Sequence, residues 1–185
     1  MTSARVSLRP LASPMQKLTI RPETVADFAA IGEVNQLAFG RDDEARLVDA
    51  LRAGAFTRLS LVAEFAGQIV GHIFFSDLPI VGVDKTVAAL ALAPIAVLPE
   101  FQKRGIGSEL VRTGLDRCRA DGQRIVMVLG DPHFYSRFGF SAAMTARLQS
   151  IYAGEAFMAL ELTPGALDGV AGRVEYPPPF SELSA

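Results

Sequence analysis

Residues 94–108 read PIAVLPEFQKRGIGS, the most informative stretch of the chain. An apolar segment runs into a tight loop that carries Gly105 and Gly107, and the apolar spacing that follows predicts a helix from Arg104 to about Asp121. The free N–H groups and the positive dipole end of a helix bind phosphate, and glycines let a backbone approach it closely. The stretch therefore predicts an anion-binding loop between a strand and a helix.

Two other phosphate loops do not fit these residues. A dinucleotide-binding G-x-G-x-x-G pattern would require glycine at position 110, where the chain has Leu110, and a P-loop would require Gly-Lys followed by Ser or Thr. Lys103 and Arg104 add positive charge to the loop. On the loop alone, a glycine-bearing helix start without a ligand stays an open alternative.

Pro94 interrupts an apolar run that extends from Val87 to Leu98. Because proline has no N–H for a sheet ladder, its place inside a strand indicates an edge, a bulge or a parting of neighbouring strands. Backbone groups left free at residues 95–97 could pair with an extended, amide-containing ligand. An ordinary edge strand explains the same pattern equally well.

The remaining segments predict a mixed α/β sheet. Apolar residues at helical spacing predict helices from Thr24 to Phe39 and from Asp43 to Arg52. The unbroken apolar run from Ile125 to Leu129 is typical of a strand covered on both faces. The other predicted strands occupy residues 17–21, 59–65, 68–76, 87–98, 157–162 and 172–176, with a hairpin turn at Ala66-Gly67.

Length and composition set the broad class. The 185 residues suffice for one domain, and we expect it to span residues 17–185 behind a flexible N-terminal tail of residues 1–16. Half of the residues are hydrophobic and 21% are charged, which predicts a proper core. A net charge of −2 gives no electrostatic basis for binding nucleic acid. Since no apolar run reaches the roughly 20 residues that span a bilayer, we expect no membrane association and a soluble, cytoplasmic protein.

Metal ligands and thiols are scarce in this sequence. The single cysteine, Cys118, excludes an internal disulfide and a multi-thiolate metal site, and two histidines leave little for a metal centre. We therefore expect no metal. Cys118 lies on the apolar stripe of the helix that follows Gly107, which indicates a core residue.

A second informative stretch, residues 128–140, reads VLGDPHFYSRFGF. Asp131-Pro132 is typical of a helix start, so Tyr135 is expected on a short helix directly after a buried strand. A tyrosine, with an ordinary pKa of about 10, can donate a proton at neutral pH to a thiolate whose conjugate acid has a pKa of about 8.5. In isolation, such an aromatic run also fits simple core packing.

Together the two stretches resemble the GNAT superfamily of acyl-CoA-dependent N-acyltransferases. Residues 102–107, QKRGIG, match its Q/R-x-x-G-x-G/A pyrophosphate motif, and residues 135–140, YSRFGF, match its frequent Y-x-x-x-G-F signature. The fuller run from Leu129 to Phe140 is similar to the YhbS-type branch of predicted N-acetyltransferases. The resemblance covers roughly residues 17–162.

This resemblance implies an α/β (α+β) fold of the GNAT type. Its central sheet is mixed but largely antiparallel, has helices on both faces, and contains a splayed pair of parallel strands. The pantetheine arm of CoA would lie in the splay and pair with backbone groups of Ile95, Ala96 and Val97, one of which polarises the thioester carbonyl. Tyr135 would protonate the departing thiolate. The pyrophosphate would rest on the loop residues Gln102, Lys103, Arg104, Gly105, Ile106, Gly107 and Ser108.

The implied function is transfer of an acetyl group from acetyl-CoA to a primary amine of a small molecule or protein. The alternative is a non-catalytic CoA-binding or interaction module on the same fold. The general base stays unassigned, because in the family that this chain resembles a chain of water molecules often takes that role. The side-chain candidates are Glu64, His72, Asp77 and His133.

We expect the acceptor to contact the two N-terminal helices, residues 77–86 and residues 147–155. The acidic residues 42–44 either attract a cationic amine or form a solvated helix start. The oligomeric state stays open, and edge strands and a proline-rich C-terminal segment would permit a homodimer.

Overall fold

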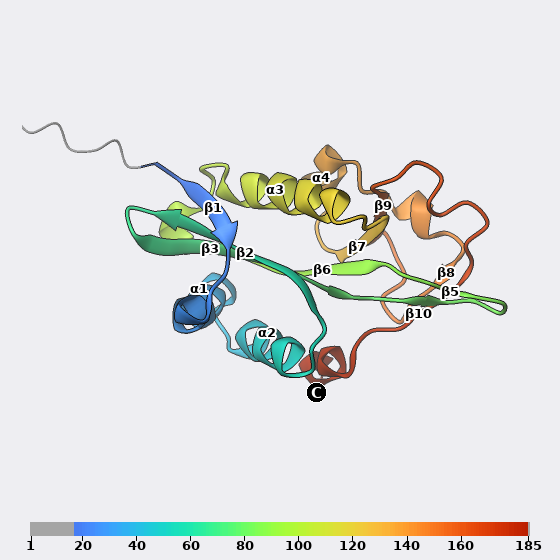
Figure 1. Ribbon diagram of the computed structural model, residues 1–185, viewed down its shortest axis with the longest axis horizontal. Coiled ribbons are helices and arrows are strands. Elements are labelled where there is room, and N and C mark those ends of the chain that lie inside the picture. Colours follow the sequence, from blue (N-terminus) through green and yellow to red (C-terminus); the bar gives the residue numbers. More distant parts are fainter. Residues whose placement is uncertain (1–16, 185) are drawn as a thin grey trace, which may run out of the picture.

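A sheet of six strands in the order β1-β2-β3-β6-β7-β9 runs through the molecule (Figure 1). The structure is a computed structural model that describes residues 17–184, so the tail expected at residues 1–16 lies outside the described residues. The strands are β1 (Thr19–Pro22), β2 (Thr57–Phe65), β3 (Gln68–Asp77), β6 (Leu90–Val97), β7 (Ile125–Leu129) and β9 (Phe157–Glu161).

Neighbouring strands of this sheet are antiparallel except for β6 and β7, which are parallel. The predicted hairpin is confirmed: β2 and β3 are joined through Ala66 and Gly67, whose φ angles of 53° and 79° suit a tight two-residue turn. The mixed, largely antiparallel sheet expected from the sequence is therefore present.

Helices cover both faces of the sheet (Figure 1). Helices α1 and α2 lie on one face and α3 and α4 on the other. Their bounds are α1 (Phe28–Phe39), α2 (Asp43–Ala53), α3 (Ile106–Ala120) and α4 (Pro132–Tyr135). Short 3-10 turns occupy Val25–Asp27, Pro99–Phe101, Ser136–Phe138, Ala142–Thr145 and Pro178–Ser184. No helix within residues 17–184 is long and apolar enough to cross a membrane.

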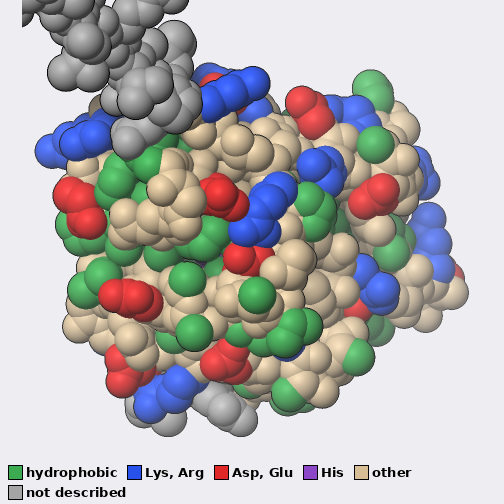
Figure 2. Space-filling view, turned by 60° about the vertical axis from the view of Figure 1, so that its left-hand side comes forward, with side chains coloured by type: hydrophobic (Ala, Val, Ile, Leu, Met, Phe, Trp, Pro, Cys, Tyr) green, Lys and Arg blue, Asp and Glu red, His purple; other side chains and the backbone are tan. Residues whose placement is uncertain are grey.

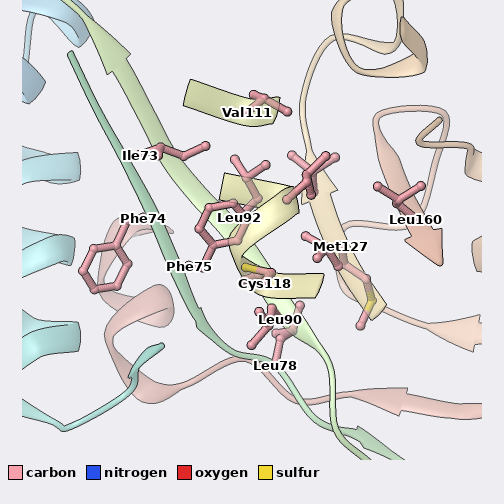
Figure 3. Packing of buried hydrophobic residues seen from close by; sticks show 14 of the residues in the cluster. Ile73, Phe74, Phe75, Leu78, Leu90, Leu92, Val111, Cys118, Met127 and Leu160 are labelled. Atoms are coloured by element: carbon pink, nitrogen blue, oxygen red, sulfur yellow. The ribbon is translucent and has the colours of Figure 1, made fainter. Parts of the chain in front are cut away.

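Successive residues of β3 fill the two halves of the core. Phe74 and Phe75 are both fully buried, and Figure 3 shows Phe74 pointing toward the α1 and α2 side while Phe75 points the other way, near Leu92 and Cys118. Phe75 fits because α3 has a glycine there: a Cβ on Gly114 would lie 2.6 Å from Phe75 Cε2. This close approach sets the separation between α3 and the sheet.

A second, smaller sheet was not predicted. Its order is β5-β4-β10-β8, and its strands are β4 (Ile80–Val81), β5 (Thr86–Val87), β8 (Leu148–Gln149) and β10 (Gly172–Val174). Strands of two or three residues are too short to show an alternating pattern, so only β10 was expected. The segment expected as a loop at residues 77–86 thus contains most of a small hairpin, and the apolar run predicted over residues 87–98 divides between β5 and β6.

Charged side chains of both signs are interspersed on the face shown in Figure 2, with apolar side chains between them. The basic residues on that face form no continuous area among the described residues. This mixed distribution agrees with the near-neutral net charge.

Candidate active site

The parallel strands β6 and β7 part soon after they begin. They pair only at Leu90 with Val126 and at Ala91 with Met127, whereas the opposite edge of β6 stays paired with β3 as far as Val97. A shift in the register with β3 lies between Leu92 and Ile95, around Pro94. Of the alternatives that Pro94 left open, the structure thus has the parting of β6 from β7 together with an irregularity in the register with β3, and β6 is not an edge strand.

Backbone groups of β6 face the gap at alternate residues. The Leu98 N–H donates to the Val70 carbonyl of β3 at 2.9 Å, so the register places Leu98 and Ala96 in hydrogen-bonded pairs with β3. By the same alternation, Ile95 and Val97 direct their N–H and C=O groups away from β3, toward the side where β7 has diverged. The Val97 carbonyl is held there by Gln102, whose Nε2 donates to it at 3.0 Å.

The loop after β6 presents a row of backbone donors. The Glu109 N–H is the first in α3 to bond back, to the Gly105 carbonyl at 3.0 Å. Within residues 17–184, the amides from Lys103 to Ser108 donate to no backbone carbonyl. Gly105 caps the helix with a φ of 85°, a left-handed conformation that glycine adopts without steric cost. For this reason α3 begins at Ile106 and not at Arg104 as predicted.

Positive charge adds to these donors. Lys103 and Arg104 are exposed, and neither forms an ion pair with any residue of the described chain. Arg104 lies over the ring of Phe101, with 5.3 Å from its Cζ to the ring centroid. The loop therefore combines free amides, a helix N-terminus and two unpaired cations, which suits an anionic group such as a phosphate.

Gly107 connects this loop to the rest of the site. A Cβ built on it would lie 3.8 Å from Phe134 Cζ, 3.8 Å from Val97 Cγ2 and 3.9 Å from Ile95 Cδ1. The first turn of α3 therefore packs against both β6 and α4. This packing brings the two sequence motifs together, although many residues separate them along the chain.

Tyr135 is fixed tightly at the end of β7. Asp131 caps α4 by accepting a hydrogen bond from the His133 N–H at 2.9 Å, as predicted. The Tyr135 side chain packs edge-on against Phe134 and Phe140, with ring centroids 4.9 and 5.6 Å away, and the residue is 7% exposed. Burial raises the pKa of Tyr135 to about 12, so the hydroxyl keeps its proton throughout the neutral range.

Tyr135 and Ile95 line one cavity of about 540 Å³. The cavity continues from the gap between β6 and β7 to the ends of α1 and α2 and to the C-terminal segment. Its charged and tyrosine side chains come from four separate stretches of the chain: Arg41, Glu44, Asp131, Tyr135, Tyr152 and Tyr176. Backbone groups that could hold an extended ligand and a proton-bearing hydroxyl thus face the same space.

His72, a general-base candidate, is instead a fully buried residue of the core. Asn35 donates its Nδ2 hydrogen to His72 Nδ1 at 3.2 Å, so Nε2 carries the proton and donates to Ser60 Oγ at 2.9 Å. Ser60 in turn donates to Glu23, which also accepts from Arg52. Burial, reinforced by the positive charge of Arg52, lowers the pKa of His72 to about 3.

The other three base candidates also lie outside the cavity lining. Glu64 accepts from Arg21 Nε at 2.9 Å, and Asp77 accepts from Arg58 Nε at 2.6 Å. His133 is exposed on the turn before Tyr135. The carboxylates that do line the cavity are those of Glu44 and Asp131.

Sequence reasoning identified part of the cavity wall and missed the rest. The two N-terminal helices contribute as expected, Tyr152 lies in the segment predicted at residues 147–155, and Leu78 comes from residues 77–86. Tyr176 and Phe180 were not expected to take part, because no local pattern places the C-terminal segment beside α2. Of residues 42–44, only Glu44 lines the cavity.

Comparisons with known proteins agree with this geometry. Residues 19–143 match the family described as "Acetyltransferase (GNAT) domain". The chain is 37% identical over 169 residues to YhbS of Escherichia coli (strain K12), described as an uncharacterized N-acetyltransferase, and the match covers 90% of this chain and 100% of that protein.

Two solved structures are also similar to this one. One is YhbS from Escherichia coli in complex with CoA, with a TM-score of 0.84, 35% identity, and coverage of 92% of this chain and 95% of that one. The other is a GNAT family acetyltransferase from Brucella melitensis in complex with acetyl-CoA, with a TM-score of 0.75, 38% identity, and coverage of 89% and 99%. The parted parallel strands, the glycine loop and these relatives lead to one assignment: the chain belongs to the GNAT family of N-acetyltransferases.

Proposed function

We propose that this protein transfers the acetyl group of acetyl-CoA to a primary amine by direct attack on the thioester. The observation that carries the proposal is the parting of β6 from β7, which exposes free backbone groups beside a donor-rich loop and in the same cavity as Tyr135. The complexes of the two similar structures with CoA and acetyl-CoA support the choice of cosubstrate.

The pantetheine arm would occupy the side of β6 that β7 leaves. The groups of Ile95 and the N–H of Val97 would pair with its amides, while Ala96 between them holds the strand to β3. Gln102 keeps the Val97 carbonyl occupied and so fixes the start of the loop. The pyrophosphate would accept hydrogen bonds from the amides of residues 103–108, beside the charges of Lys103 and Arg104.

In the reaction, the amine lone pair attacks the thioester carbonyl carbon and a C–N bond forms. The carbonyl π electrons move to the oxygen, and a backbone N–H of β6 stabilises the resulting oxyanion. The nitrogen loses its extra proton to solvent, the oxyanion electrons re-form the C=O bond, and the C–S bond breaks with its electron pair on sulfur, which takes up a proton and leaves as the CoA thiol. Holding the two reactants in place supplies much of the rate, on the order of 7–11 kcal/mol for well-oriented partners.

Burial raises the pKa of Tyr135 to about 12, so its hydroxyl would still carry its proton when the thiolate departs. Tyr135 would donate a hydrogen bond to the sulfur as negative charge develops there, and then its proton, which solvent restores. A hydrogen bond to a charged group contributes about 1.5–3 kcal/mol, so Tyr135→Phe should lower kcat by roughly ten- to a hundredfold and leave CoA affinity nearly unchanged.

A thermal-shift titration with acetyl-CoA, CoA, NAD and ATP in parallel tests the cosubstrate. At a hundred times Kd, a ligand of the folded state adds about 2.7 kcal/mol to the free energy of unfolding, and we expect this shift from acetyl-CoA and CoA alone. A shift from NAD or ATP without one from either CoA species would contradict the loop assignment. Stabilisation by CoA with no amine-dependent thiol release would indicate the non-catalytic module.

A further inference from the structure

On the side where the amine would enter, the cavity that Tyr135 lines has a wall rich in aromatic side chains. Five aromatic residues line it: Phe39, Tyr135, Tyr152, Tyr176 and Phe180. Three of them, Tyr152, Tyr176 and Phe180, form a connected group, with ring centroids 5.2 Å apart for Tyr152 and Tyr176 and 5.3 Å apart for Tyr176 and Phe180. Aromatic and aliphatic walls with a few polar groups are typical of small-molecule sites.

Two of the apolar side chains in this wall are far more exposed than core residues. Phe39, the last residue of α1, is 41% exposed, and Leu129, the last residue of β7, is 49% exposed. Leaving large apolar side chains in contact with water at the edge of a cavity is unfavourable without an apolar partner. Leu129 borders the gap that the pantetheine arm would occupy, so it is the exposure of Phe39 that points to an acceptor with an apolar body.

The charges of the cavity leave one carboxylate unpaired. Arg41 donates from both Nε and Nη2 to the Glu44 carboxylate, so these two charges cancel. Asp131 accepts the His133 amide at Oδ1, and its Oδ2 has no partner among residues 17–184. A single negative charge at the solvent-exposed edge suits one ammonium group. A second charge on the ligand would be buried in the cavity without a partner, which is unfavourable.

We propose, resting on the proposed function, that the amine acceptor is a small monoamine with an apolar body of aromatic size. Its body lies between Phe39 and the Tyr152–Tyr176–Phe180 wall, and Asp131 receives its ammonium group at the edge. The cavity of about 540 Å³ is shared with the pantetheine arm and the acetyl group, so the space that is left suits a small acceptor and not a large one. Polyamines, lysine side chains of proteins and free amino acids are poorer fits.

The apolar interior also assists the chemistry. Attack on the thioester needs the neutral amine, and desolvation disfavours an ammonium ion. An amine that moves from the Asp131 edge toward Ile95 and Tyr135 therefore loses its proton more readily than in water. This effect reduces the need for a side-chain base inside the cavity.

Ligand-observed NMR titrations of the CoA-saturated protein test the acceptor class. The probes are 2-phenylethylamine, spermidine, phenylalanine and an acetyl-lysyl-methylamide with a free side-chain amine. We expect 2-phenylethylamine to bind at least tenfold more tightly than the other three. Equal affinities, or a preference for any of the other three probes, would overturn the proposal.

Two substitutions locate the binding site. Phe39→Ala should raise Kd and KM for 2-phenylethylamine by at least fivefold with little change in kcat, whereas Leu37→Ala should change neither. Leu37 is a matched control because it lies on the same last turn of α1, is 52% exposed, and does not line the cavity. Identical effects of the two variants would contradict a site at Phe39.

Asp131→Asn tests the charge separately, since asparagine also caps a helix well. The variant should fold normally and bind 2-phenylethylamine at least fivefold more weakly, and an unchanged Kd would refute the role of Asp131. Binding and turnover separate the two proposals. Binding of 2-phenylethylamine without thiol release would support the acceptor class and contradict catalysis, while turnover of a different amine would do the reverse.

Discussion

The substitution Gly130→Ala tests whether catalysis depends on the placement of Tyr135. Gly130 follows β7, and a Cβ built on it would lie 2.4 Å from Tyr135 Cε2 and 3.1 Å from Cδ2. Carbon atoms in contact prefer separations of about 3.5–4.0 Å, so the ring must move by about 1 Å. Displacements of that size near reacting atoms can cost about a hundredfold in rate, equivalent to roughly 2.7 kcal/mol.

We therefore expect Gly130→Ala to lower the rate of thiol release by about a hundredfold at saturating acetyl-CoA. Overpacking should also reduce the free energy of unfolding by about 1–3 kcal/mol, which lowers Tm by roughly 2–4 °C for each kcal/mol. CoA affinity, measured by calorimetry, should change by less than twofold, because the loop at residues 102–108 is untouched.

Two controls make the result interpretable. Gly32→Ala adds a methyl group with nothing within 4 Å, so it should keep full activity and gain up to about 1 kcal/mol of helix stability. The double variant Gly130→Ala/Tyr135→Phe should be no slower than Tyr135→Phe alone, because both changes act on the same hydroxyl. If Gly130→Ala keeps its rate within threefold of the wild type, or if the two effects multiply, the reasoning is refuted.

Three further results are expected. Gly114→Ala should destabilise the fold by about 1–3 kcal/mol in urea titrations despite its better helix propensity, because its Cβ would collide with Phe75; a gain in stability would contradict the packing described for α3. The pKa of His72 in the folded protein, about 3, lies below its ordinary 6.5, so the unfolded chain takes up the proton first as pH falls and stability declines from pH 6.5 toward pH 3. The wild type should lose up to about 2 kcal/mol between pH 6.5 and 5, and His72→Gln should not; equal losses would exclude His72 as the cause. Burial raises the pKa of the Cys118 thiol to about 12, so iodoacetamide should label it slowly in the native protein and fully in urea, and rapid native labelling would contradict its burial.

Local backbone rules explain why the elements around the proposed cosubstrate site could be predicted. Pro94 marks the parting of the strands, Gly105 the helix start and Asp131 the cap before Tyr135. Each of these residues acts on its immediate neighbours in the chain. A single sequence shows such effects directly, which is why the predicted and observed elements agree there within a few residues.

The proposed acceptor side depends on long-range packing, which local patterns do not encode. Tyr176 and Phe180 reach the cavity because β10 pairs with β4 and β8 in a sheet of very short strands. His72 was similarly ambiguous in the sequence. Its position in the core became clear only when Asn35 and Ser60, from distant segments, were seen to contact its two ring nitrogens.

The small sheet brings the C-terminal segment to the cavity, so the two sides of the proposed site come from different parts of the chain. In the proposed function, the groups that would hold the cosubstrate come from one continuous segment, from β6 through α3 to α4, whereas the proposed acceptor wall is assembled from α1, α2, the loop at Tyr152 and the C-terminal segment after β10. Substitutions at Phe39, Tyr176 or Phe180 would therefore alter the proposed acceptor wall without touching the loop at residues 102–108. A duplicated copy of such a gene could acquire a new acceptor through changes at these positions while its acetyl donor stayed the same.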